Sequence, residues 1–229
     1  MNVSIFIRTY EKDIKWLNYC LQSIHKNLVG WSEIVICIPK GQEHLLSHLT
    51  SEKIVTCKSY KDDYIGQQIS KLESYKYCKN ELILFVDSDV IFKKGAKVND
   101  FFDNNKPVIL YDKYENVGDA ICWKPITEKL FREEISYEFM RRSGQLFYKS
   151  SLENIAKHFP NLEDYAISQP YRQFSEFNIM GFYCFKNEKE NYKFIDLSKE
   201  TAPVTHCKQF WSWSGLLDSE EIEIKKLIG

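Results

Sequence analysis

The chain has 229 residues, of which 44% are hydrophobic and 28% are charged, and its formal net charge is −1. This composition indicates a globular protein with a sizeable core and excludes a disordered chain. A net charge near zero supplies no overall field for nucleic acid or acidic lipid. We therefore expect no nucleic-acid partner. No window holds 18 apolar residues, so we also expect no membrane span.

The cysteines favour a reducing compartment. There are seven of them, widely spaced and never arranged as C-x-x-C, and several lie within apolar runs. A free cysteine in such a run behaves as a small buried hydrophobe, which argues against a disulfide framework. Arg8 and Glu11 interrupt the only early apolar run. We therefore expect no signal peptide and a cytoplasmic protein.

The first half of the chain alternates between strand and helix patterns. Apolar runs predict strands over 3–7, 34–38, 54–57 and 82–86. Apolar spacings of three and four predict a helix over 14–28, and shorter helices are expected over 43–49 and 66–75. The run at 82–86 is apolar on both faces, which is typical of a central strand covered by helices. This order predicts an α/β fold with a mainly parallel sheet flanked by helices.

The second half is less regular. We expect a strand over 107–110, a helix over 126–142, a short strand over 145–148 and a helix over 152–159. An apolar run at 177–185 is interrupted by Gly181, and 201–215 is expected to be a loop rich in aromatic residues. With no repeat and no obvious linker, we expect a single domain over 1–229.

Two acidic residues, Asp87 and Asp89, follow the fourth predicted strand. In open α/β sheets, ligands bind in the crevice beyond the carboxyl ends of the strands. Two close carboxylates repel each other, and a divalent cation that also holds a diphosphate would relieve that repulsion. The alternative is an ordinary solvated turn, where Asp and Ser are common.

The segment 81–92, ELILFVDSDVIF, resembles the D-x-D segment of GT-A fold glycosyltransferases, and the order of elements over 1–92 is similar as well. The resemblance implies a Rossmann-like GT-A domain that transfers a sugar from a nucleotide-sugar, with UDP as our first choice, to a glycan or glycoprotein acceptor. It implies Mn²⁺ or Mg²⁺ on Asp87 and Asp89. Residues 1–105 would bind the nucleotide-sugar and 106–229 the acceptor. The part of the chain after residue 92 is similar, more loosely, to small viral and bacterial GT-A domains, including those that build chlorella-virus capsid glycans. A viral enzyme of this kind would act in the host cytoplasm.

His206 is the third metal ligand that the resemblance implies, with Lys208 reaching the diphosphate. Glycogenin-like enzymes carry such a histidine and lysine, but this chain lacks the Gly and Pro of their pattern. An ordinary loop histidine is the alternative. Two carboxylates with an imidazole would favour Mn²⁺ over Mg²⁺.

Other residues are implied as donor contacts. Arg8, Thr9 and Tyr10 end the first predicted strand, where GT-A enzymes contact the base and ribose. Asp63 follows the third strand, and the helix before the acidic strand supplies two polar residues. The implied donor-binding set is Arg8, Thr9, Tyr10, Asp63, Gln67, Lys71, Ser88 and Lys208. Polar strand ends, turns and solvated helix faces are the alternatives.

Glu176 is the implied catalytic residue, because an acidic residue in this late segment often faces the acceptor hydroxyl. It would be the general base of an inverting enzyme, or would orient the sugar in a retaining one. Trp211 and Trp213 are the implied acceptor-binding platform, with buried packing as the alternative.

Three rival functions share parts of this pattern. A HAD-type phosphatase also has an apolar strand followed by D-x-D, with Asp87 then acting as nucleophile, but that motif normally lies on the first strand. A nucleotidyltransferase would need a glycine-rich loop after the first strand, and Arg8–Lys12 contains no glycine. A sugar-binding module with a structural cation would bind glycan without consuming a nucleotide-sugar.

Overall fold

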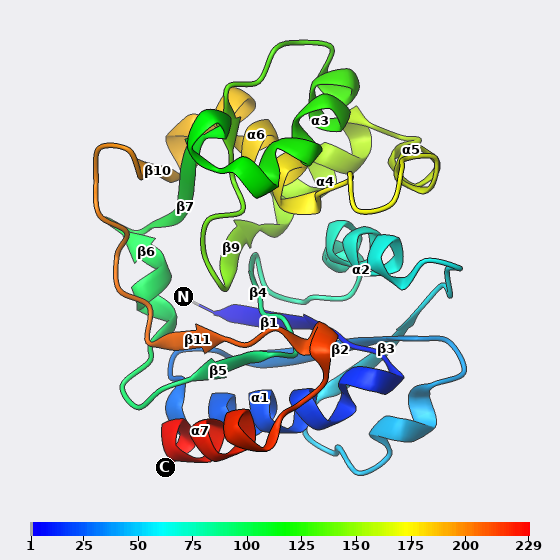
Figure 1. The fold of residues 1–229 in the computed structure, drawn as a ribbon, viewed down its shortest axis with the longest axis vertical. Coiled ribbons are helices and arrows are strands. Elements are labelled where there is room, and N and C mark those ends of the chain that lie inside the picture. Colours follow the sequence, from blue (N-terminus) through cyan, green and yellow to red (C-terminus); the bar gives the residue numbers. More distant parts are fainter. Residues whose placement is uncertain (1) are drawn as a thin grey trace.

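The main sheet has five strands in the order β3-β2-β1-β4-β9 (Figure 1). The structure is a computed structural model that describes residues 2–229. Strands β1 to β4 run parallel to one another, and β9 runs antiparallel to β4. This confirms the predicted α/β fold with a mostly parallel sheet. The strands are β1 (Val3–Arg8), β2 (Glu33–Pro39), β3 (Lys53–Cys57), β4 (Leu82–Phe85) and β9 (Gln145–Tyr148).

Both faces of the sheet are buried along β1, β2 and β4, as the apolar run at 82–86 predicts for its own strand. Side chains alternate along β1, so Ile5 and Ile7 pack with α1 (Ile14–Asn27) while Phe6 faces the opposite cluster. That second cluster includes residues of α2 (Asp63–Leu72), α4 (Lys149–His158) and α6 (Glu176–Asn187). The remaining helices are α3 (Lys124–Phe131), α5 (Leu162–Ile167) and α7 (Asp218–Ile228). Helix α7 packs beside α1 (Figure 1).

The predicted helix over 126–142 is wrong. Helix α3 ends at Phe131, Arg132 takes a left-handed conformation with φ of 58°, and β8 (Tyr137–Glu138) follows. Ile135 and Phe139 are still buried, but on an extended segment, because a spacing of four does not fix the backbone between them. Gly181 lies inside the continuous helix α6. A Cβ there would meet the Cβ of Phe139 at 2.3 Å, so this glycine permits close packing.

The sequence patterns missed a pairing that matters for the site. Strand β5 (Val90–Phe92) directly follows the acidic motif and pairs antiparallel with β11 (Cys207–Gln209). The segment predicted as a loop over 201–215 therefore contains a strand. In Figure 1 the late chain returns along β5 and beside the early half of the sheet. Two residues far apart in sequence, Asp89 and Phe210, are joined by a backbone hydrogen bond of 2.9 Å.

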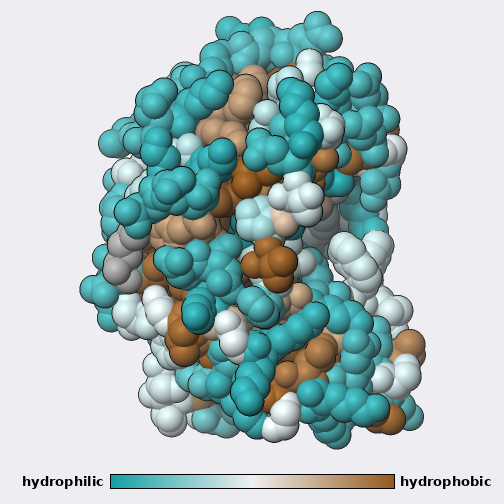
Figure 2. Space-filling model, turned by 90° about the vertical axis from the view of Figure 1, so that its left-hand side faces the viewer, coloured by the Kyte–Doolittle hydropathy of each residue, from teal (hydrophilic) through white to brown (hydrophobic). Residues whose placement is uncertain are grey.

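A smaller sheet belongs to the second half. It contains β6 (Phe102–Asp103), β7 (Lys106–Lys113), β8 and β10 (Lys193–Asp196). Of the helices described over residues 2–229, none is long and apolar enough to cross a membrane. The face in Figure 2 is largely hydrophilic, with hydrophobic residues exposed in separate patches.

Candidate functional site

The acidic motif forms the turn between β4 and β5. The amide of Val90 donates to the carbonyl of Asp87 across 3.1 Å, which closes a four-residue turn containing Ser88 and Asp89. Asp87 is partly buried and Asp89 is buried. The turn lies at the carboxyl end of β4, beside the parallel strand β1. This is the edge at which ligands bind in open α/β sheets.

Lys71 joins two of the predicted site residues. Its ammonium lies 2.7 Å from Oδ1 of Asp87 and 2.9 Å from Oε1 of Glu176. Gln67, one turn earlier on α2, donates to the same Asp87 oxygen across 3.3 Å. Burial alone would lower the pKa of Lys71, but the charges of Asp87 and Glu176 raise it above its ordinary value. Lys71 is therefore a buried cation held between two carboxylates.

Glu176 is placed by the start of α6. Ser175 caps that helix by accepting from the amide of Asn178, and the amide of Glu176 donates to Gln68 on α2 across 2.8 Å. Asn178 in turn donates to the fully buried Glu138 across 3.1 Å. These contacts fix the backbone that carries Glu176. One oxygen of its carboxylate, Oε2, is buried without a hydrogen-bond partner in the described chain.

Asp89 is held by the late segment of the chain. The amide of Ser212 donates to its Oδ2 across 3.1 Å, and the side chain of Gln209 lies 3.5 Å from its Oδ1. Gln209 also accepts from Ser143, which precedes β9. Burial and the neighbouring charge of Asp87 raise the pKa of Asp89 from 3.8 to about 7. The two motif carboxylates therefore resist being ionised together without a cation.

A third acid stands close to this pair. Ser88 donates to Oδ2 of Asp13 across 3.1 Å, which attaches the turn to the start of α1. Burial raises the pKa of Asp13, against the opposing effect of that hydrogen bond. Asp13 was not among the predicted site residues. Its position just before a helix gave no signal, because acidic residues are common at helix starts.

The predicted base-binding residues cluster at the end of β1. The guanidinium of Arg8 forms an ion pair with Asp63 and donates to the carbonyl of Thr9. Arg8 and Thr9 are buried, while Tyr10 and Asp63 remain partly exposed. The hydroxyl of Thr9 has no hydrogen-bond partner in the described chain. Four of the predicted donor contacts are therefore adjacent, and two of them present polar groups to solvent.

The structure does not bring His206 to the acidic pair. Its Nδ1 lies 3.1 Å from Asp100, and it precedes β11 at the end remote from Asp89, because Gln209 rather than Cys207 pairs with Val90. Lys208 is turned to Glu223 at 2.5 Å. In residues 2–229, no three His, Cys, Asp or Glu side chains are grouped so as to hold a metal ion. The predicted three-ligand centre is not formed here.

The two motif carboxylates still fit a metal that is shared with a substrate. Mg²⁺ in particular is commonly held by one or two carboxylates together with phosphate oxygens and water. The raised pKa of Asp89 is the observation that favours a cation at this place. Without an imidazole beside the pair, the donor set is all oxygen, so the reason for preferring Mn²⁺ over Mg²⁺ falls away.

Trp211 and Trp213 are not part of the core. They are 59% and 66% exposed, which excludes the alternative of buried packing. They flank Ser212, whose amide bonds to Asp89. The platform implied by the resemblance therefore lies next to the acidic turn.

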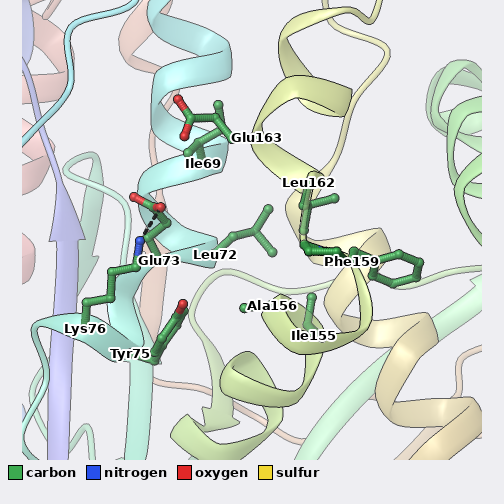
Figure 3. A pocket seen from close by; sticks show the side chains of 11 residues that line it. Ile69, Leu72, Glu73, Tyr75, Lys76, Ile155, Ala156, Phe159, Leu162 and Glu163 are labelled. Atoms are coloured by element: carbon green, nitrogen blue, oxygen red, sulfur yellow. Dashed lines mark hydrogen bonds and ion pairs between the residues drawn. The ribbon is translucent and has the colours of Figure 1, made fainter.

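A hollow of about 210 Å³ lies elsewhere, between the end of α2 and helices α4 and α5 (Figure 3). Leu72, Ile155 and Phe159 line it, and the ion pair of Glu73 with Lys76 stands at its side. None of the predicted site residues lines this hollow, so we do not connect it with the acidic turn.

Comparison with known proteins adds no relative, since no family model and no curated protein matches the chain.

Proposed function

We propose that this chain is a metal-dependent glycosyltransferase of the GT-A type. The observation that carries the proposal is the Asp87–Ser88–Asp89 turn at the carboxyl edge of a mostly parallel sheet, with Lys71 and Glu176 in contact beside it. The donor is a nucleotide-sugar, with a UDP-sugar as first choice, and the acceptor is a glycan or glycoprotein. Residues 1–105 bind the donor and 106–229 shape the acceptor side.

Donor binding uses the end of β1 and the acidic turn. The partly exposed side chains of Asp63 and Tyr10 are available to the base and ribose. Asp87 and Asp89 would hold Mn²⁺ or Mg²⁺, which would supply positive charge to the diphosphate leaving group. The ion pair with Lys71 orients the Asp87 carboxylate. The backbone amide of Ser212 holds one oxygen of Asp89 by a hydrogen bond.

Glu176 is the proposed catalytic residue. Its Oε1 is bound by Lys71, and its Oε2 is free to accept a hydrogen bond from a hydroxyl group. In an inverting reaction, Glu176 takes the proton of the attacking acceptor hydroxyl. In a retaining reaction, it orients the donor sugar instead. The burial of Glu176 and Lys71 keeps bulk water from this proton.

The topology supports the transferase over the phosphatase alternative. The D-x-D motif of that phosphatase class normally lies on the first strand of its domain. Here the acidic turn follows the fourth strand of the chain, and that strand lies next to an antiparallel strand, β9.

A donor screen by thermal unfolding tests the proposal. The protein is heated with UDP-, GDP- and dTDP-sugars, each with and without Mn²⁺ or Mg²⁺. A ligand that binds the folded state raises the melting temperature according to its concentration and affinity. We expect at least one donor to do so only when metal is present, and Asp89→Ala to abolish that rise. If no nucleotide-sugar stabilises the protein with metal, the proposal is wrong.

A further inference from the structure

Four side chains form an exposed cluster beside the acidic turn, which we call the aromatic–arginine cluster: Tyr171, Arg172, Trp211 and Trp213. The guanidinium carbon of Arg172 lies 5.3 Å from the ring centre of Tyr171 and 5.1 Å from that of Trp213. The two tryptophan rings meet edge to face at 5.5 Å. All four residues are exposed. Three large aromatic rings and a cation therefore share one accessible surface.

The position of Arg172 is fixed by its backbone. Its φ of 58° is in the left-handed region that a residue other than glycine rarely adopts. The indole of Trp123 donates to the carbonyl of Arg172 across 3.0 Å, and the thiol of Cys122 lies 3.8 Å from the same oxygen. Backbone conformations of this kind persist where surrounding contacts hold them, and they gather at ligand sites.

The guanidinium of Arg172 has no acidic partner. Across residues 2–229, no carboxylate forms an ion pair with it and no oxygen accepts a hydrogen bond from it. By contrast, Arg8 and Arg141 each hold a carboxylate. Two aromatic rings lie beside the guanidinium, and its N–H groups remain open to an anion.

The cluster connects the two sides of the proposed site. Tyr171 packs edge to face on Tyr64 of α2 at 6.2 Å, and the hydroxyl of Tyr64 donates to Phe174, two residues before Glu176. Trp213 follows Ser212, whose amide bonds to Asp89. The cluster is therefore attached both to the segment that precedes Glu176 and to the segment that holds Asp89.

We propose that the aromatic–arginine cluster is a subsite for a sugar that carries a carboxylate or phosphate group. Aromatic faces fit the C–H face of a sugar ring, and the open edge of Arg172 matches a carboxylate or phosphate with two parallel hydrogen bonds. Its role as an acceptor subsite rests on the proposed transferase function. The binding of the anionic sugar itself does not.

The test is calorimetric titration with three disaccharides that differ at one carbon: cellobiose, its 6′-carboxylate and its 6′-phosphate. We expect one or both acids to bind about 10-fold or more tightly than cellobiose, since a hydrogen bond to a charged group contributes that much. The preferred acid identifies the group. Trp213→Ala should weaken all three ligands, because it removes the ring that both the sugar and Arg172 contact.

Arg172→Gln should remove the preference for acids and leave cellobiose unchanged. The matched control is Arg132→Gln, because Arg132 is also exposed and also has φ of 58°, yet stacks on no aromatic ring in the described chain. Equal binding of the three disaccharides, no binding of any, or an acid preference that survives Arg172→Gln would each overturn the proposal.

Failure of the subsite and failure of the transferase are separable with the same preparations. If Arg172→Gln loses the acid preference but no nucleotide-sugar binds the wild type, the anionic-sugar site stands and the transferase proposal is wrong. If a nucleotide-sugar binds with metal while Arg172→Gln changes nothing, the transferase stands and the subsite is wrong.

Discussion

The backbone amide of Ser212 donates a hydrogen bond of 3.1 Å to the Asp89 carboxylate, although 123 residues separate them in the chain. Trp211 and Trp213 flank this serine and are exposed. The segment that carries them is therefore attached directly to one of the two proposed metal ligands. In our proposal, this contact couples the aromatic surface to the donor site.

Replacing Asp89 with asparagine should stabilise the metal-free protein at neutral pH. Burial and Asp87 raise the pKa of Asp89 to about 7, so the folded state binds more protons than the unfolded state between pH 4 and 7. Stability contributed by this group is therefore largest below pH 4 and is lost as the pH rises through 7. At pH 7.5 we expect Asp89→Asn to raise the melting temperature by about 2–8 °C. At pH 4 we expect it to leave the melting temperature unchanged. Unfolding scans across this range would show an equal effect at every pH if the idea is wrong.

Lys71→Met should destabilise the fold strongly. The substitution leaves Asp87 and Glu176 without their buried cation, and breaking a buried ion pair commonly costs about 3–5 kcal/mol. Urea unfolding measures the loss. Adding Glu176→Gln to the same variant should recover part of it, because one unpaired charge is removed. Lys76→Met is the control, since its pair with Glu73 is at the surface and contributes at most about 1 kcal/mol. Equal losses for the two lysines would contradict the buried arrangement.

His206→Ala should leave metal-dependent donor binding within about 3-fold of wild type, which is a free-energy change of under about 1 kcal/mol. The reason is that His206 contacts Asp100 and not the acidic turn. The Mn²⁺ concentration required for half-maximal donor binding is the measurement, with Asp89→Ala as the variant that loses it. A loss above 10-fold in His206→Ala would mean that the late segment rearranges to make this histidine a ligand.

Glu176→Gln should slow turnover by about 10²–10⁴-fold while donor affinity changes little, because general-base catalysis contributes on that scale. Released nucleoside diphosphate gives the rate, and calorimetry gives the affinity. Glu190→Gln, at an exposed site, is the control. An unchanged rate in Glu176→Gln would remove this residue from the mechanism.

Local sequence patterns predicted the parts of the fold that depend on a single strand or helix. The four parallel strands and the turn at Asp87 follow from apolar runs and their ends, and these predictions of the fold are confirmed. The contact of Lys71 with Asp87 also lies within one strand–helix unit, and it was the resemblance that implied Lys71 as a donor contact.

The rest depended on pairings between distant segments. Strand β11 has only three residues, and nothing in Cys207–Gln209 shows that it pairs with Val90–Phe92. The register of that pairing brings Gln209 and Ser212 to Asp89 and takes His206 away. One histidine in a loop has no periodic signal that fixes such a register.

The most direct test of the transferase is turnover. The protein is incubated with a panel of UDP-, GDP- and dTDP-sugars, with and without Mn²⁺ or Mg²⁺, and released nucleoside diphosphate is measured against Asp89→Ala. We expect release from at least one donor only with metal and only from the wild-type protein. Release from no donor in the presence of either metal, or equal release by Asp89→Ala, would contradict a metal-dependent glycosyltransferase.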